Sequence, residues 1–179
     1  MKTCALYGFI SSLAGAFIIL ALYFLGYHSD LAKLGTAKVI GGVGGFVCAV
    51  VITSLGVRAR REEVPASQGF GYGSSVWAGV VIAFVASVLS ALFNFVYYKF
   101  INPGFSEILI QDAMAKVEAK GVSGPALDRI EAFNRFLFTP FWESVIALIV
   151  GFIFGVFLAL IIAIFIRRPE PATAPGVQA

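Results

Sequence analysis

The sequence has 179 residues, of which 59% are hydrophobic and 13% are charged, and its formal net charge at pH 7 is +3. Soluble domains carry about 25% charged residues, and a chain of this size cannot hide so much apolar surface from water because small folds keep a large surface. The composition therefore excludes an ordinary soluble enzyme, a disordered chain and a nucleic-acid-binding protein. It predicts a protein that lies in a lipid bilayer.

Four long apolar runs follow one another along the chain, and each is long enough to cross a membrane. A helix needs about 20 apolar residues to span a hydrocarbon core of about 30 Å. The runs predict membrane-spanning helices over residues 4–27, 36–57, 75–98 and 140–166. We expect an all-α, antiparallel bundle of four transmembrane helices in one membrane domain, residues 1–168, followed by a disordered, Pro- and Ala-rich tail over residues 169–179.

The distribution of basic residues predicts how the four spans are oriented. With four spans both termini lie on one side, and that side carries three basic flanks: Lys2, then Arg58, Arg60 and Arg61, then Arg167 and Arg168. Basic residues beside a span stay in the cytoplasm, so we expect both termini to be cytoplasmic. The opposite side carries the short turn around His28, where we expect a solvated histidine.

Residues 99–139 form the largest segment predicted to lie outside the membrane. Asn102-Pro103 is typical of a helix N-cap followed by proline, and apolar residues then recur at helical spacing as far as Gly121. A second helix is predicted after Ser123-Gly124-Pro125. Either the two helices form an amphipathic cap on the bundle end or on the lipid headgroups, or they extend the third and fourth spans beyond the lipid.

Small residues recur four positions apart along the predicted spans. Such stripes let helix backbones approach closely in a bilayer, where apolar burial does not drive helix association. We therefore expect helix packing at seven such positions: Gly41, Gly45, Gly79, Ala83, Gly151, Gly155 and Ala159. Packing within the chain is the expected role of the stripes, and the stripe of the fourth span, which is the longest, is the best candidate to face a partner.

Two polar side chains inside the predicted spans are candidates for a functional role, because buried polar groups are costly in a membrane. They are Asn94 in the third span and Glu143, one turn into the fourth. For Glu143 we favour stabilisation by water and by the helix dipole, and for Asn94 a hydrogen bond between helices. The sequence contains no cluster of His, Cys and carboxylate residues, so we predict no catalytic residue, no cofactor and no metal site.

Several short motifs around the last two spans are similar to those of one membrane-protein family. The motifs are Tyr97-Tyr98, Ile101-Asn102-Pro103, Phe105 and Thr139-Pro140. On these motifs, residues 1–168 resemble the bacterial family known as domain of unknown function 4199. The resemblance implies a bacterial inner-membrane protein with four helices, and it implies no activity.

The sequence thus favours a non-enzymatic, multi-pass inner-membrane protein that acts through protein or lipid contacts, such as an accessory or structural subunit of a membrane complex. Its expected partners are the lipid bilayer and, through the fourth span, other membrane subunits or a second copy of the chain. The alternative is a small oligomeric transporter or channel, in which Asn94 and the glycine cluster over residues 41–45 line a path.

Overall fold

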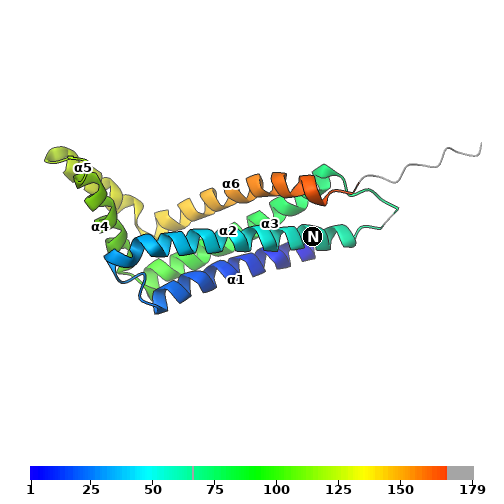
Figure 1. Ribbon diagram of the computed structural model, residues 1–179, viewed down its shortest axis with the longest axis horizontal. Coiled ribbons are helices and arrows are strands. Elements are labelled where there is room, and N and C mark those ends of the chain that lie inside the picture. Colours follow the sequence, from blue (N-terminus) through cyan, green and yellow to red (C-terminus); the bar gives the residue numbers. More distant parts are fainter. Residues whose placement is uncertain (66, 169–179) are drawn as a thin grey trace, which may run out of the picture.

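The computed structural model describes residues 1–65 and 67–168, which form helices almost throughout (Figure 1). Four helices are long: α1 (Lys2–Phe24), α2 (Leu31–Glu62), α3 (Tyr72–Val96) and α6 (Pro140–Ile166). A π-helical turn and two shorter helices connect α3 to α6: η1 (Tyr97–Ile101), α4 (Phe105–Glu118) and α5 (Pro125–Leu137). The described residues form no β-strand, so the predicted all-α class is confirmed. The tail predicted over residues 169–179 lies outside the described residues.

Each of the four long helices is apolar enough to cross a membrane, with η1 counted as part of α3. Their most apolar 18-residue windows have mean hydropathies between 2.1 and 3.2, and only 11–28% of each window is buried within the protein. Large apolar side chains face outward instead, such as Phe17 and Phe165, which are 74% and 80% exposed. Contact between so much apolar surface and water is unfavourable, so the four helices indicate a multi-pass membrane protein.

The ends of α2 differ from those of its predicted span. The apolar run predicted a helix over residues 36–57, whereas α2 has 32 residues and begins at Leu31. The Asp30 carboxylate accepts a hydrogen bond from the Ala32 amide at 2.9 Å and caps the helix. At the other end, arginines in the last turn suit the negative end of the helix dipole. The apolar run therefore located the uncharged part of the helix, and turns that contain charged residues extend the helix at both ends.

α3 packs against the other three long helices, and its contact with α6 is the most extensive. Small residues make this seam tight. A Cβ atom added to Gly79 would lie 2.5 Å from Ala159 Cβ, and one added to Gly155 would lie 2.5 Å from Ala83 Cβ. Such close approach of two backbones is what small residues permit in membrane helices. The small-residue stripe of α6 therefore contacts α3 of the same chain at these positions.

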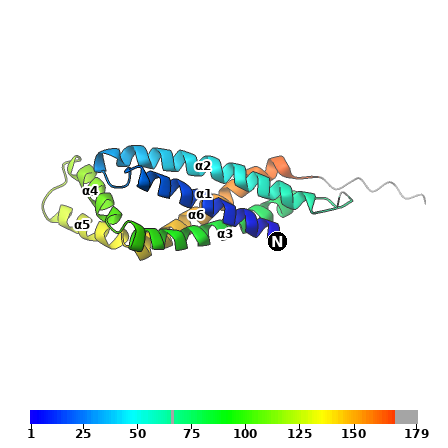
Figure 2. The same cartoon turned by 90° about the horizontal axis from the view of Figure 1, so that it is seen from below.

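The N-terminus and the end of α6 lie at the same end of the long helices (Figures 1 and 2). Arg168, just after α6, pairs with Phe70 through two backbone hydrogen bonds of 2.8 and 2.9 Å. Its guanidinium also donates to the carbonyl oxygens of Val64, Pro65 and Gln68 at 2.9–3.0 Å. These bonds fix the end of α6 to the loop between α2 and α3.

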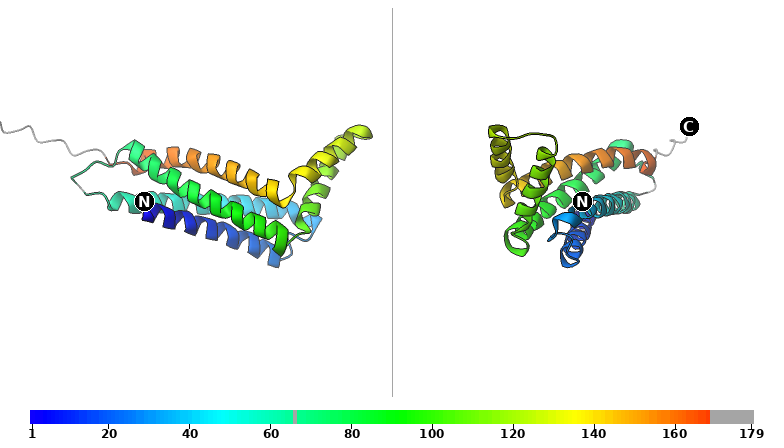
Figure 3. Two further views of the ribbon diagram at one scale, coloured as in Figure 1. Left: turned by 180° about the vertical axis from the view of Figure 1, so that it is seen from behind. Right: turned by 60° about the vertical axis from the view of Figure 1, so that its left-hand side comes forward.

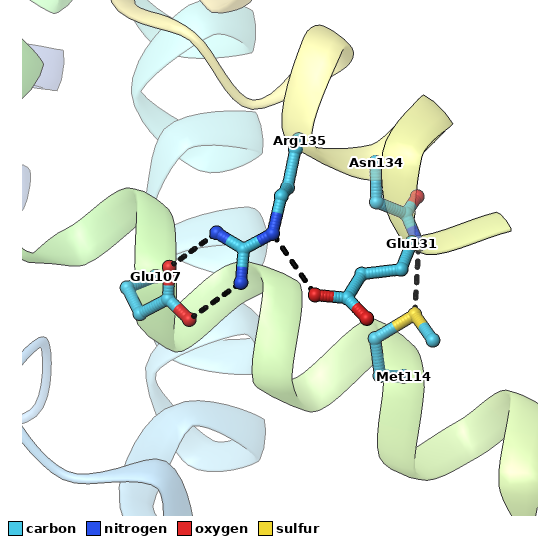
Figure 4. A network of polar contacts seen from close by, with 5 residues as sticks. All are labelled: Glu107, Met114, Glu131, Asn134 and Arg135. Atoms are coloured by element: carbon cyan, nitrogen blue, oxygen red, sulfur yellow. Dashed lines mark hydrogen bonds and ion pairs between the residues drawn. The ribbon is translucent and has the colours of Figure 1, made fainter. Parts of the chain in front are cut away.

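α4 and α5 form a helical hairpin beyond the other end of the long helices (Figure 3). Arg135 of α5 donates to the two carboxylate oxygens of Glu107 on α4 at 3.1 and 3.4 Å, and to Glu131 at 2.9 Å (Figure 4). The Asn134 amide contacts the Met114 sulfur at 3.6 Å. Non-helical turns separate the hairpin from η1 and from α6, so α4 and α5 do not continue the long helices.

Candidate functional site

A groove follows the side of α2 that faces α6, and α1, α3 and α4 also contribute to its walls. It consists of three adjoining cavities with volumes of about 710, 480 and 440 Å³. The first and second cavities share Gly15, Gly42 and Gly45 in their linings, and the second and third share Phe46, Phe154 and Leu158. Cavities of roughly 300–1,000 Å³ with mainly apolar walls are typical of small-molecule sites. We call these three cavities the groove.

The groove is as long as the apolar part of a bilayer is thick. Lys38 lines the first cavity and Arg58 lines the third. Both belong to α2, and a rise of 1.5 Å per residue places them about 30 Å apart along the helix. A hydrocarbon core is also about 30 Å thick, so the groove has a basic residue near each end and apolar walls between them.

Glycines on α2 leave room in the groove. A Cβ atom added to Gly42 or Gly45 would have no heavy atom within 4 Å. Gly41 also lines the first cavity, and a Cβ there would lie 3.5 Å from the side chain of Leu22 on α1. A side chain at Gly45 would meet no neighbour, so the small size of this glycine leaves space in the groove. On the opposite wall, Gly151 lines the second cavity together with Gly155.

Charged side chains gather at the first cavity, beside α4. Lys38 of α2 and Lys116 of α4 each place Nζ 2.6 Å from the same oxygen of Asp112, Oδ2. The hydrogen bonds from Lys116 and Lys38 hold the pKa of the Asp112 carboxyl below its usual range. One carboxylate thus faces two ammonium groups, which leaves an excess of positive charge. We call Lys38, Asp112 and Lys116 the mouth of the groove.

Glu143 also lines the first cavity, as does Tyr98. The structure therefore brings this candidate from the sequence together with the mouth residues, which sequence reasoning did not single out. The available signal was Lys38, the one charge in the predicted span 36–57. The other candidate, Asn94, is not among the residues that line the three cavities of the groove.

His28 is buried, with 7% of its surface exposed, which corrects the expectation of a solvated histidine. Its Nδ1 atom lies 2.6 Å from the Tyr97 hydroxyl, and its ring stacks on Phe105 with centroids 4.3 Å apart. The ring is covered because η1 and the start of α4 pack over the turn between α1 and α2. This burial lowers the pKa of His28.

The Asn102 side chain bonds to His28 and Tyr97 and does not cap α4. Its amide nitrogen donates to the Tyr97 hydroxyl at 3.2 Å and to the His28 carbonyl oxygen at 3.4 Å. α4 begins three residues later, at Phe105. The cluster of His28, Tyr97, Asn102 and Phe105 fixes α4 to the end of α1, and so fixes the α4 residues that form the mouth.

The arrangement of the groove matches an elongated ligand with one polar end. Its apolar length can hold a hydrocarbon chain, and the charged mouth can hold a polar group. Within residues 1–65 and 67–168, no group of three or more His, Cys, Asp and Glu side chains is placed to hold a metal ion.

Comparisons with known proteins assign a family. The family model described as "Protein of unknown function (DUF4199)" matches residues 6–168, a range that includes every residue lining the groove. No curated protein and no solved structure matches the chain.

Proposed function

The chain belongs to the family described as "Protein of unknown function (DUF4199)", and we propose that it is a non-enzymatic, multi-pass protein of the bacterial inner membrane that holds a membrane lipid in the groove. In this proposal α1, α2, α3 and α6 cross the bilayer as an antiparallel bundle. The end that carries both termini and the arginine clusters faces the cytoplasm, in keeping with the retention of basic flanks there.

One observation carries the proposal: adjoining cavities with mainly apolar walls follow α2 from Lys38 to Arg58, a rise of about 30 Å that equals the thickness of a hydrocarbon core. An apolar groove on the surface of membrane helices lies among lipid tails, and a tail is the apolar molecule nearest to it. Gly42 and Gly45 keep space free where side chains would otherwise fill it. We favour binding over catalysis because three charged groups of the first cavity, those of Lys38, Lys116 and Asp112, are engaged with each other.

The test compares two substitutions on the same helix. Gly45→Leu places a side chain in the groove, whereas Gly35→Leu places the same side chain at an exposed position where a Cβ also meets no atom within 4 Å. Native mass spectrometry of protein extracted in a mild detergent measures the lipid that each variant retains. We expect the wild type and Gly35→Leu to retain lipid and Gly45→Leu to lose it. A wild type without bound lipid, or equal retention by the two variants, contradicts the proposal.

A small oligomeric transporter or channel is the second candidate, and the length of the groove supports it. A path with a basic residue near each end and glycines along one wall could carry an amphiphile between the leaflets. Flux or lipid exchange in reconstituted vesicles tests this candidate, and Gly45→Leu should abolish it. An oligomer of this kind, or a complex with another membrane subunit, would use the outward face of α6, where Ile149 and Ile153 are 52% and 63% exposed.

A further inference from the structure

Two lysines from different helices meet at the mouth of the groove. Because the Nζ atoms of Lys38 and Lys116 lie 2.6 Å from one oxygen of Asp112, the two ammonium groups are only a few ångströms apart. Like charges at this spacing repel, and Asp112 holds them side by side while neutralising one of them. The lysine side chains are 48% and 63% exposed, against 20% for Asp112, so both ammonium groups are accessible from outside.

The mouth lies where α2 changes from polar to apolar. Lys33 and Lys38 are the charged residues of its first two turns, and no charge follows until Arg58. Lys38 therefore stands at the boundary between the hydrocarbon core and the headgroup region, which adds roughly 5–8 Å on each side of the core. A lipid phosphate lies at this depth. Below it the groove continues past Gly42 and Gly45.

We propose that the groove binds a membrane phospholipid, whose phosphodiester lies between Lys38 and Lys116 and whose acyl chain lies along Gly42 and Gly45. This inference rests on the proposed function and adds the class of lipid and the residues that select it. Two adjacent ammonium groups can donate to different oxygens of one phosphate, and charge-assisted hydrogen bonds of this kind are among the strongest in proteins. A lipid with an uncharged headgroup offers them no anionic oxygen.

Glu143 of α6 also lines the first cavity, as does Tyr98. A carboxylate in this wall repels anionic oxygens. We therefore expect the phosphate to lie on the side of the cavity formed by α2 and α4, next to the two lysines.

The test uses the full chain, delipidated in detergent, and three lipids with identical oleoyl chains: dioleoylphosphatidylglycerol, dioleoylphosphatidylethanolamine and dioleoylglycerol. Native mass spectrometry with lipid titration gives the affinity for each. We expect the wild type to bind both phospholipids at least ten times more tightly than dioleoylglycerol, a difference of about 1.4 kcal/mol. Lys38→Gln/Lys116→Gln should bind all three lipids alike. The control Lys33→Gln/Lys120→Gln removes the same charge from the first turn of α2 and from the turn that follows α4, and it should keep the wild-type preference.

The outcomes separate the two proposals. If the wild type binds dioleoylglycerol as tightly as the phospholipids, the phosphate site is wrong and the lipid groove stands. If no lipid binds, both are wrong. Inorganic phosphate is a further probe. If it binds as tightly as the phospholipids and with the same dependence on Lys38 and Lys116, the acyl chains add no affinity and the phospholipid proposal is wrong. Should the double variant fail to fold, Lys116→Gln alone provides the same comparison, because its side chain is the more exposed of the two.

Discussion

α6 meets α3 and α2 along two seams of opposite character. In the closed seam, with α3, Gly155 and Ala83 approach so closely that a Cβ on the glycine would lie 2.5 Å from the alanine Cβ. In the open seam, with α2, a Cβ on Gly42 or Gly45 would meet no atom within 4 Å. Both seams contain glycines four positions apart, yet in one they bring backbones together and in the other they leave space.

The difference lies in what stands opposite each glycine. Small residues of α3 face those of α6, so the two helices interlock. Across the open seam, Phe46 of α2 and Phe154 of α6 meet with ring centroids 6.1 Å apart. Both rings line the second and third cavities, and Gly42 and Gly45 line the second. A stripe of small residues therefore predicts close packing only where the facing helix also presents small residues.

The same substitution in the two seams should have opposite effects, and this is the largest difference that we predict. Gly155→Ala forces a Cβ against Ala83, which is attached directly to the backbone and cannot rotate away. Overpacking of this kind costs about 1–3 kcal/mol. Gly45→Ala meets no neighbour, and alanine is favoured over glycine in a helix by up to about 1 kcal/mol. Thermal unfolding of each variant in detergent micelles should therefore show a lower midpoint for Gly155→Ala and an unchanged or higher one for Gly45→Ala.

Gly35→Ala is the control for helix propensity alone, since this position on α2 is also open. It should match Gly45→Ala in stability. A strong destabilisation by Gly45→Ala would show that α2 and α6 close upon each other in the membrane, and the distinction between the two seams would fail.

The sequence was sufficient for the parts of the fold that depend on composition. Apolar runs gave the number and approximate places of the long helices, because a hydrocarbon core requires long apolar segments. They did not give the ends of α2, where Asp30 caps a first turn that contains Lys33. Nor could they distinguish the two seams, since Gly45 and Gly155 belong to the same kind of repeat and differ only in what faces them.

The candidate site was less accessible to sequence reasoning because its contacts join distant residues. Lys38 and Asp112 are 74 positions apart, and His28 and Tyr97 are 69 apart. Both pairs form because α4 turns back over the end of the long helices, an arrangement that no local periodicity encodes. Glu143 was singled out because it is the one charge in an apolar span, and it lies in the first turn of α6, but the sequence pattern gave no information about which residues surround it.

Acid should destabilise the region around His28 and α4, next to the mouth of the groove, more than the closed seam between α3 and α6. In the folded protein, burial holds the pKa of His28 below its ordinary value of 6.5. The unfolded chain therefore takes up the proton first as the pH falls, so the contribution of neutral His28 is complete above pH 6.5 and is lost below it. We expect faster hydrogen exchange in the turn between α1 and α2 and in α4 at pH 5.5 than at pH 7.5, after correction for intrinsic rates, with little change in the paired parts of α3 and α6.

His28→Gln removes the titrating group and keeps a side chain that can bond to the Tyr97 hydroxyl. Its exchange in α4 should depend less on pH than that of the wild type. An identical pH dependence in both proteins would assign the effect to carboxylates elsewhere and would leave His28 with a purely structural role.

Arg135→Ala should have the smallest effect of these substitutions, because it removes a contact within the α4–α5 hairpin alone. Arg135 joins α5 to α4 through Glu107, and both side chains are about half exposed, at 52% and 49%. Exposed ion pairs contribute little to global stability, so the thermal midpoint should hardly change. Exchange in α5 should nevertheless rise, since this bidentate contact is a main link between the two helices. Arg129→Ala, on the same helix but outside this ion pair, should leave exchange in α5 unaltered. If Arg135→Ala also loosens the seam between α3 and α6, then the closed seam depends on the hairpin, and the two seams of α6 are not independent.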